Sequence, residues 1–398
     1  MKTQEFIDLT EKFSAHNYAP LPVVLSSAEG AWVTDVEGRR YLDLLSAYSA
    51  LNFGHRNARI TAAAHRQLDA LTLTSRAVYS ENFALFCQEL ATLCKKDKVL
   101  PMNSGAEAVE TAIKATRKWG YEVKGIPPDK AEIIVCKNNF HGRTIAIVGF
   151  STSEESRNGF GPFTRGFKVV EHGSIEAVKN AITPNTAGVL FEPILGEGGY
   201  IIPPEGFLKD LRAVCSQHNV LMIADEIQTG LCRTGEIFAC DHEGVTPDIF
   251  ILGKSLGGGI IPLSAIAADD AVMNVFTPGS HGSTFGGNPL ASAIGREVIA
   301  LIREEEPHKK AAELGSYIVE RISAMNVTAV TAVRARGLMV GIDVDMKRGK
   351  AKDFCKALLN EGVICKDTRV QSIRAAPPLC ISKDDLDWAL ERFERVLA

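Results

Sequence analysis

The 398-residue chain lacks any apolar run close to the roughly 18 residues that a membrane-spanning helix requires. Its first residues, Met1–Asp8, mix charges of both signs and therefore do not resemble a secretory signal or an organellar transit peptide. The formal net charge is only −4, so no excess of one sign favours nucleic acid or an anionic membrane. These absences predict a cytoplasmic protein that has neither a membrane nor nucleic acid as a partner.

Cysteine occurs nine times, but no two cysteines have the C-x-x-C spacing of redox or zinc sites. The number is odd, and several cysteines fall within apolar stretches, as reduced core cysteines do. This usage predicts a reducing compartment. Hydrophobic residues make up 45% and charged residues 23% of the chain, which is ordinary for a globular protein with a sizeable core. The length predicts two or more folding units.

The middle of the chain, about 50–290, alternates short apolar runs with helical patterns. Continuous apolar runs indicate strands that are buried on both faces of a parallel sheet. Between two of them, Phe207, Leu211 and Val214 form a helical apolar stripe. The alternation predicts an α/β domain with a mainly parallel, seven-stranded sheet. The predicted strands are 132–136, 144–149, 167–170, 187–191, 220–224, 248–252 and 263–268.

The C-terminal hundred residues have a different pattern, which predicts a smaller α+β unit. The predicted elements are helices at about 308–324 and 350–361, a last helix that Ser382 caps, and strands at 338–344 and 372–380. The first forty-odd residues are expected to join this unit. We therefore predict an N-terminal segment (1–48) that joins the small domain, a large domain (49–290) and a C-terminal small domain (291–398).

Lys254 and Asp225 are the most informative pair in the sequence. Asp225 ends the apolar run 220–224, and Lys254 follows the run 248–252. Because ligands of parallel sheets bind beyond the carboxyl ends of the strands, both side chains are expected at one cofactor site. A lysine that forms a Schiff base and an aspartate that pairs with a pyridinium nitrogen are what pyridoxal phosphate (PLP) requires. Taken alone, Lys254 would more often be a surface lysine in a glycine-rich turn.

Two stretches are suited to binding the phosphate of such a cofactor. At 103–107, small residues begin a helical pattern, where backbone N–H groups and the helix dipole favour an anion. At 281–288, a glycine-rich loop carries two hydroxyl groups. Without a PLP lysine, the first stretch would be an ordinary capped helix and the second a polar loop. The residues concerned are Ser104, Gly105, Ala106, Ser283 and Thr284.

Two further motifs are suited to a ring and a carboxylate. Phe140 and Arg143 follow a predicted strand, and a phenyl ring can stack on a pyridine while arginine grips a carboxylate with two hydrogen bonds. Alone, this motif would be a strand-end turn with a surface arginine. Gln228 lies one helical turn after Asp225 and can reach the ring hydroxyl. A metal site at Asp225-Glu226 is the alternative, but no histidine or cysteine lies at a useful spacing, so no metal is predicted.

Together these motifs resemble the class III, fold-type I PLP-dependent aminotransferases, and the match extends over essentially the whole chain. Within this family the chain is most similar to members that act on ornithine. The related enzymes that act on acetylornithine usually lack a tyrosine at the position of Tyr48. The stretches that carry the resemblance are 16–22, 44–50, 73–77, 118–126 and 373–378.

The resemblance implies a role for each residue of the cofactor site. Lys254 would hold PLP covalently and, once freed, would move a proton between the substrate carbon and the cofactor. Asp225 would hold the pyridinium nitrogen, which keeps the ring an electron sink. Phe140 would stack on the ring and Gln228 would contact its oxygen. The phosphate ligands would be Ser104, Gly105, Ala106 and, from the neighbouring subunit, Thr284, which makes a homodimer necessary for a complete site.

The resemblance also implies the substrates, L-ornithine and 2-oxoglutarate. Arg143 would bind the α-carboxylate of ornithine, and Tyr18 and Tyr48 would shape the pocket around its α-amino end. With 2-oxoglutarate, Arg143 would take the γ-carboxylate and Arg374 the α-carboxylate. Glu197 would cover Arg374 during the ornithine half-reaction and swing away for the dicarboxylate. A fixed structural ion pair is the alternative for Glu197.

The sequence departs from the usual family pattern in three places. Leu195 stands where a glutamine usually precedes the Gly-Glu pair, and Ala375 stands where phenylalanine is common. Both departures lie beside the proposed Glu197–Arg374 gate. Asn57-Ala58 replaces a usual His-Pro, which is a loop change.

Two other functions remain open from the sequence. One is another class III ω-aminotransferase that uses acetylornithine or 4-aminobutyrate, against which Tyr18 and Tyr48 argue. The other is a non-catalytic binding protein of the same fold. The joint presence of Lys254, Asp225 and two arginines argues against it.

Overall fold

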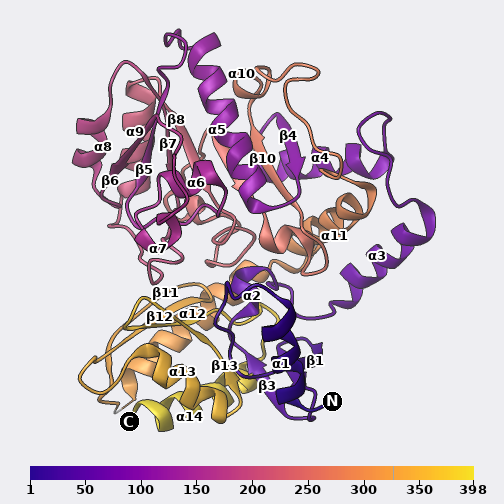
Figure 1. Cartoon of the computed structure of the whole chain (residues 1–398), viewed down its shortest axis with the longest axis vertical. Helices are drawn as coiled ribbons and strands as arrows, with labels where there is room; N and C mark the ends of the chain where they lie inside the picture. Colours follow the sequence, from indigo (N-terminus) through magenta and orange to yellow (C-terminus); the bar gives the residue numbers. More distant parts are fainter. Residues whose placement is uncertain (326) are drawn as a thin grey trace.

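The computed structural model describes residues 1–325 and 327–398, which form two lobes (Figure 1). The upper lobe contains a seven-stranded sheet in which only β10 runs antiparallel to its neighbours. The mainly parallel sheet that the sequence predicts is therefore confirmed. In spatial order its strands are β4 (Lys98–Met102), β10 (Ser264–Ala268), β9 (Ile249–Leu252), β8 (Leu221–Asp225), β7 (Thr186–Phe191), β5 (Glu132–Cys136) and β6 (Phe167–Val170).

One predicted strand is wrong. Residues 144–149 do not enter the sheet but form the short helix α6 (Ile145–Gly149), in which Ile147 and Val148 are buried and Ile145 is exposed. A short apolar run does not distinguish a strand from a helix by periodicity alone. The seventh strand is instead β4, which contains Pro101. Proline is tolerated there because β4 lies at the edge of the sheet.

Alternate residues of the central strands pack on opposite faces of the sheet. In β8, Leu221 and Ile223 join the hydrophobic cluster of helix α5 (Gly105–Glu122), whereas Met222 and Ala224 join that of helix α9 (Phe207–Gln217). Both faces of the sheet are therefore buried in hydrophobic packing, as the continuous apolar runs predict. Polar side chains can point to a ligand only where these strands end.

The lower lobe, which we call the small lobe, combines both ends of the chain (Figure 1). Strand β3 pairs in parallel with β13, so a residue pair such as Leu42 and Val363 lies side by side. The sheets are β1 (Leu25–Glu29), β2 (Trp32–Asp35), β3 (Arg40–Asp43) and β13 (Val363–Ile364), and β11 (Val330–Arg336), β12 (Met339–Val344), β15 (Ser372–Ala375) and β14 (Lys366–Thr368). Its helices from the C-terminal part of the chain are α12 (Pro307–Ala324), α13 (Ala351–Asn360) and α14 (Lys383–Leu397).

The predicted elements of the C-terminal region are largely confirmed. Ser382 caps α14 by accepting a hydrogen bond from the Asp385 backbone N–H at 3.0 Å. The strand predicted at 372–380 ends earlier, at Ala375, because the chain then passes through Pro377 and Pro378. In the part of the chain that the structure describes, no helix is long and apolar enough to cross a membrane.

The remaining helices connect or cover these sheets. Helices α3, α4 and α11 pack together at one side of the upper lobe. The bounds are α1 (Thr3–Phe13), α2 (Ser46–Ser49), α3 (Ala58–Ala70), α4 (Glu81–Cys94), α7 (Glu154–Arg157), α8 (Ile175–Ala181), α10 (Asp270–Met273) and α11 (Pro289–Glu305), with the 3₁₀ turns η1 (Ala239–Glu243) and η2 (Lys254–Gly257).

Candidate active site

A cavity of about 210 Å³ lies at the carboxyl ends of the parallel strands, as expected for an open α/β sheet. An adjoining hollow shares Lys254 and Gly105 with it and is also lined by Ser104. Most of the side chains that the sequence selects for a cofactor thus meet in one place. The cavity is lined by Gly105, Ala106, Phe140, His141, Gly142, Glu192, Asp225, Ile227, Gln228, Thr229 and Lys254.

Lys254 is held in a strained position that presents its side chain to the cavity. It begins the turn η2 directly after β9 and Gly253, and its φ is +47°, in the left-handed region. Burial lowers the pKa of Lys254 to about 8, against the opposing influence of Glu197 and Asp225. A lysine with such a pKa is partly neutral near pH 7.5 and is therefore a ready nucleophile.

Asp225 ends β8 and is 5% exposed. Its Oδ2 accepts a hydrogen bond from His141 Nδ1 at 2.6 Å, and its Oδ1 accepts one from the Ile227 N–H at 3.1 Å. Burial alone would lower the pKa of His141, but the hydrogen bond to Asp225 and its charge outweigh that effect and raise the pKa. The histidine is therefore a donor that fixes the carboxylate in the cavity. His141 lies in the same sequence motif as Phe140 and Arg143, but the motif alone does not indicate this role.

Glu192 is a second buried carboxyl group that sequence reasoning missed. It follows β7, accepts hydrogen bonds from the N–H groups of Phe140 at 2.8 Å and Gly196 at 3.0 Å, and lines the cavity. Burial raises the pKa of Glu192 to about 7, and Asp225 adds to this shift while His141 opposes it. The sequence contained a signal for Glu192, since this residue directly follows an apolar run, as Asp225 does.

The buried glutamate leads to a prediction for stability. Because its pKa is raised on folding, Glu192 contributes stability below pH 4.5 that is lost as pH rises through about 7. Glu192→Gln removes this dependence. We expect the unfolding free energy of the wild type to fall relative to the variant by roughly 3 kcal/mol between pH 4 and 8. Urea unfolding across this range measures it, with the exposed Glu154→Gln as control; parallel pH curves for wild type and Glu192→Gln would contradict it.

The N-terminus of α5 offers a place for a phosphate. Ser104 Oγ accepts from the Glu107 N–H at 3.2 Å, and the Glu107 carboxylate accepts from the Ser104 N–H at 2.7 Å, which caps the helix. The first-turn N–H groups of Gly105 and Ala106 lack helical partners, as at every helix start. A Cβ at Gly105 would lie 3.0 Å from Ile227 Cδ1, so glycine lets the start of α5 pack closely against Ile227, another residue that lines the cavity. These features fit an anionic group at this end.

Ser283 and Thr284 do not line the cavity of their own chain. Ser283 Oγ accepts from Asn103 Nδ2 at 2.9 Å and from the Gly286 N–H at 3.0 Å, beside the start of α5. Thr284 is exposed. This placement leaves Thr284 accessible to another subunit. That Thr284 binds the phosphate in the site of a neighbouring subunit stays a prediction.

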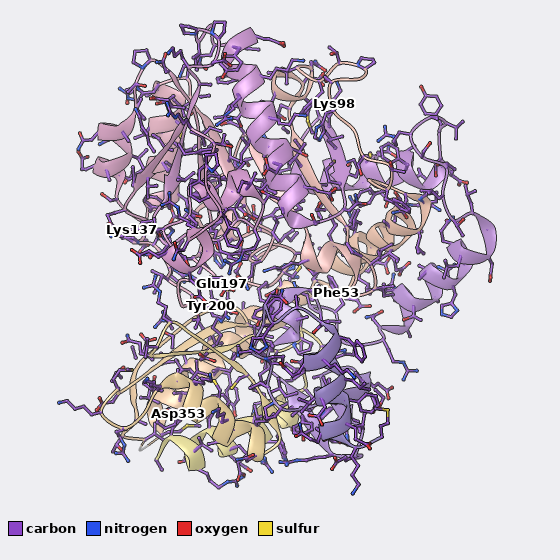
Figure 2. All side chains as sticks on the ribbon, viewed as in Figure 1. Phe53, Lys98, Lys137, Glu197, Tyr200 and Asp353 are labelled. Carbon is purple, nitrogen blue, oxygen red and sulfur yellow. The ribbon has the colours of Figure 1, made fainter. Side chains whose placement is uncertain are left out.

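Arg374 and Glu197 form an ion pair where the lobes meet. Arg374 is 4% exposed, and its Nη1 donates to Glu197 Oε1 at 2.6 Å. Burial lowers the pKa of Arg374, but Glu197 more than compensates and raises it. The Tyr48 ring centre lies 5.2 Å from the guanidinium carbon. Figure 2 shows Glu197 near Tyr200 at this junction.

The other predicted substrate residues lie at the edge of the site. The guanidinium carbon of Arg143 lies 5.3 Å from the Phe140 ring centre. Gln228 Nε2 donates to the Tyr48 carbonyl at 3.4 Å, which connects the cavity to that tyrosine. Tyr18 is 75% exposed, so the described chain leaves it open to solvent.

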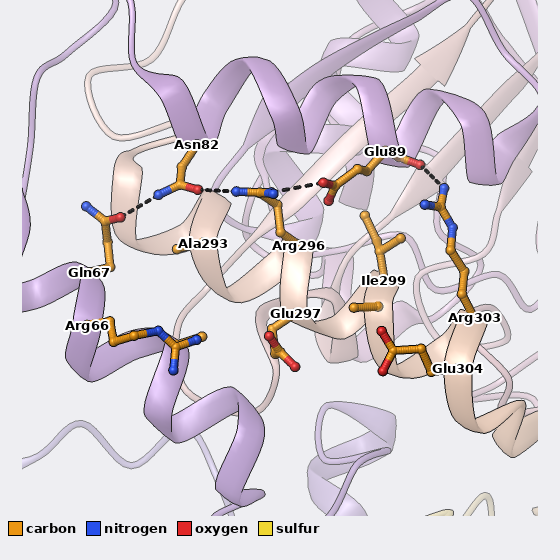
Figure 3. Close-up of a pocket in the computed structure, with 12 residues that line it drawn as sticks. Arg66, Gln67, Asn82, Glu89, Ala293, Arg296, Glu297, Ile299, Arg303 and Glu304 are labelled. Carbon is orange, nitrogen blue, oxygen red and sulfur yellow. Dashed lines mark hydrogen bonds and ion pairs between the residues drawn. The ribbon is translucent and has the colours of Figure 1, made fainter.

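A larger cavity, of about 440 Å³, lies between α3, α4 and α11 (Figure 3). Its charged groups are largely engaged with one another. Arg296 binds Glu89 at 3.0 Å and Asn82 at 2.7 Å, and Arg303 donates to the Glu89 carbonyl at 3.0 Å. Glu297 binds Arg59 at 2.7 Å. Paired charges of this kind indicate a structural network rather than a reaction centre.

A lysine and an aspartate at neighbouring strand ends, facing an open helix N-terminus, define a fold-type I PLP-dependent enzyme. The model of the family described as Aminotransferase class-III matches residues 13–397. The chain belongs to this family of PLP-dependent transaminases.

Similar proteins agree with this assignment. The chain is 53% identical over 396 residues to an ornithine aminotransferase of Brevibacillus brevis, covering 100% of this chain and 98% of the relative. It is 52% identical over 396 residues to that of Bacillus subtilis, with the same coverage. An ornithine aminotransferase structure from Toxoplasma gondii has a TM-score of 0.97 at 41% identity, covering 100% of this chain and 95% of that one. An acetylornithine aminotransferase from Elizabethkingia anophelis has a TM-score of 0.90 at 43% identity, with 100% and 99% covered.

Proposed function

We propose that this protein is an ornithine δ-aminotransferase, which transfers the δ-amino group of L-ornithine to 2-oxoglutarate. The products are L-glutamate 5-semialdehyde, which cyclises to pyrroline-5-carboxylate, and L-glutamate. The observation that carries the proposal is the Glu197–Arg374 ion pair beside Tyr48. Full-length identity of 50–54% to several ornithine aminotransferases supports the same substrate.

Each residue of the cavity has a task in this reaction. PLP supplies an electron sink when it is bound. Lys254 attaches the cofactor and afterwards moves a proton at its Nζ. Asp225, oriented by His141, provides the negative charge that a pyridinium nitrogen requires. The Phe140 side chain would cover one face of the cofactor ring and exclude water from it. The first turn of α5 binds the phosphate.

The charges at the lobe junction select the substrate. While Glu197 neutralises Arg374, Arg143 is the one of these two arginines that can bind a carboxylate, so ornithine enters with its α-carboxylate remote and its δ-amine toward Lys254. A dicarboxylate competes with Glu197 for Arg374 and then contacts both arginines. Leu195 and Ala375 are both buried beside this pair, and neither replaces a charge.

We further propose that the enzyme is a cytoplasmic homodimer in which Thr284 completes the phosphate site of the neighbouring subunit. Exposed apolar side chains near α4 and the 283–288 loop support a partner there. Tyr79 is fully exposed, Val78 is 58% exposed and Phe285 is 56% exposed. The proposed domains remain 1–48 with 291–398, and 49–290.

A comparison of amino donors tests the proposed substrate. We expect ornithine to exceed N-acetylornithine and 4-aminobutyrate in kcat/KM with 2-oxoglutarate as acceptor. Tyr48→Ile should reduce the ornithine preference about 10- to 100-fold, because a pocket that loses a hydrogen-bonding group loses discrimination. Tyr121→Ile, remote from the cavity, is the matched control.

The alternative substrates give different outcomes. A wild-type preference for acetylornithine, the substrate named for the Elizabethkingia structure, would contradict the ornithine assignment while retaining the family. A purified protein without a cofactor absorbance band and without activity would favour a non-catalytic binding protein.

A further inference from the structure

Arg233 is a buried cation that no step of the reaction uses. It lies in the segment after β8 and is 0% exposed. Its Nη1 donates to the carbonyls of Leu338 at 3.0 Å and Pro377 at 2.6 Å, both in the small lobe. Its Nε and Nη2 donate to Asn52 Oδ1 at 3.0 and 2.5 Å. All these acceptors are neutral, and burial lowers the pKa of Arg233 to about 10. A buried charge whose hydrogen-bond acceptors are all neutral is costly, which indicates that this arrangement has a structural role.

Asn52 connects Arg233 to η2, the turn that begins with Lys254. Its side chain is 0% exposed, and its Nδ2 donates to the Leu231 carbonyl at 3.1 Å and to Ser255 Oγ at 3.2 Å. With two donors to Oδ1, every hydrogen-bonding position of the amide is filled. The amide therefore has one orientation, because a flip would place NH₂ against the guanidinium. Ser255 directly follows Lys254, whose strained φ requires support from its surroundings.

The two carbonyl groups that Arg233 binds in the small lobe belong to segments next to Arg374. Pro377 lies three residues after Arg374, and Leu338 precedes β12, in which Gly341 pairs with Arg374. Backbone hydrogen bonds reinforce the junction: the Leu338 N–H donates to the Arg233 carbonyl at 3.1 Å, and the Leu379 N–H donates to the Asn52 carbonyl at 2.7 Å.

The backbones also touch at Gly337. A Cβ at Gly337 would lie 2.4 Å from the Gly235 nitrogen. The small lobe therefore meets the segment around Arg233 without an intervening side chain. Backbone contact at this point brings the small lobe directly against the segment that carries Arg233.

We propose that Arg233 and Asn52 form a bridge that sets the position of the small lobe, and hence of Arg374, relative to Lys254. Both are positioning residues, and the inference rests on the proposed function. A dicarboxylate substrate contacts Arg143 in the upper lobe and Arg374 in the small lobe, so its binding depends on the spacing of the lobes. Ornithine has a single carboxylate, which contacts Arg143, and its contacts with Tyr18 and Tyr48 involve no ion pair across the lobes, so its binding depends less on that spacing.

The experiment compares two variants of the PLP-bound enzyme. Arg233→Lys loses the planar fork and cannot serve Asn52 and both carbonyls together. Calorimetry should show about tenfold weaker binding of glutarate, an unreactive dicarboxylate, and the KM for 2-oxoglutarate should rise similarly. The single-turnover rate at saturating ornithine should change less than about twofold, because saturation removes any effect on ornithine binding. Arg321→Lys, in a surface ion pair with Asp387, is the control.

Ser255→Ala removes only the hydrogen bond between Asn52 and Ser255 of η2. Here glutarate binding should be unchanged, while single-turnover rates in both half-reactions should fall about tenfold because Lys254 is less well held. Thr116→Val is the control, since Thr116 is a buried hydroxyl that donates within its own helix at 2.7 Å.

Three results would overturn the bridge. The first is that Arg233→Lys binds glutarate as tightly as the wild type. The second is that Arg233→Lys lowers the rates of both half-reactions equally, and the third is that Ser255→Ala has wild-type single-turnover rates. If Arg233→Lys does not fold, the Ser255→Ala result decides alone. If the wild type does not use ornithine but Arg233→Lys still weakens glutarate binding, the bridge holds and the proposed substrate is wrong.

Discussion

Lys254→Ala should lower the turnover of ornithine with 2-oxoglutarate by at least about 10⁴-fold. The substitution removes both the amine that attaches the cofactor and the base that moves the substrate proton, and proton transfer alone contributes about 10²- to 10⁴-fold. A coupled assay for glutamate formation measures the loss. Added methylamine should restore part of the activity, because it supplies a small amine to the space that the side chain leaves.

Lys137→Ala is a suitable control for this experiment. Lys137 also follows a strand of the sheet, β5, but it is exposed and pairs with Glu171 at 2.8 Å on the surface. Figure 2 shows it at the outer edge of the upper lobe. Its variant should retain wild-type turnover. Substantial activity in Lys254→Ala without added amine would disprove the assignment of the catalytic lysine.

Asp225→Asn should reduce kcat about 10²- to 10³-fold and weaken PLP binding. Removing one partner of a buried charged pair costs about 3–5 kcal/mol, and here the change leaves His141 without its carboxylate. The amide also removes the charge that a pyridinium nitrogen requires. Stopped-flow turnover and cofactor titration measure the two effects.

Asp35→Asn distinguishes a local effect from general destabilisation. Asp35 is also buried, and its Oδ2 accepts from Tyr41 Oη at 2.9 Å, but it lies in the small lobe. We expect it to lower thermal stability with little effect on kcat. If Asp225→Asn loses no more activity than Asp35→Asn, the role of Asp225 at the ring nitrogen is wrong.

Much of the upper lobe could be predicted because its strands are buried on both faces. The runs ending at Phe191, Ala224 and Leu252 are apolar, and the structure places them as adjacent strands. The prediction failed where this signal is ambiguous. The run 144–149 is too short to separate a helix from a strand, and β4 was missed because Pro101 argues against a strand unless the edge position is known.

The site was predictable where function and strand ends coincide. Lys254, Asp225 and Phe140 meet in one cavity because each follows a strand of the same sheet. Glu192 and the Arg233–Asn52 contact were not predicted. Asn52 and Arg233 are 181 residues apart, and their pairing depends on how the lobes dock rather than on any local pattern.

The pairing of β3 with β13 also has a consequence for how the chain folds during synthesis. Arg40–Asp43 has its parallel partner at Val363–Ile364, some 320 residues later. At about 5–20 residues per second, a ribosome needs roughly 15 to 65 s to make the intervening chain. During that interval the N-terminal strands lack one neighbour, while the sheet from β4 to β10 can already form. Arg374 is made later still, so the substrate selection that we propose for it would be acquired only at the end of translation.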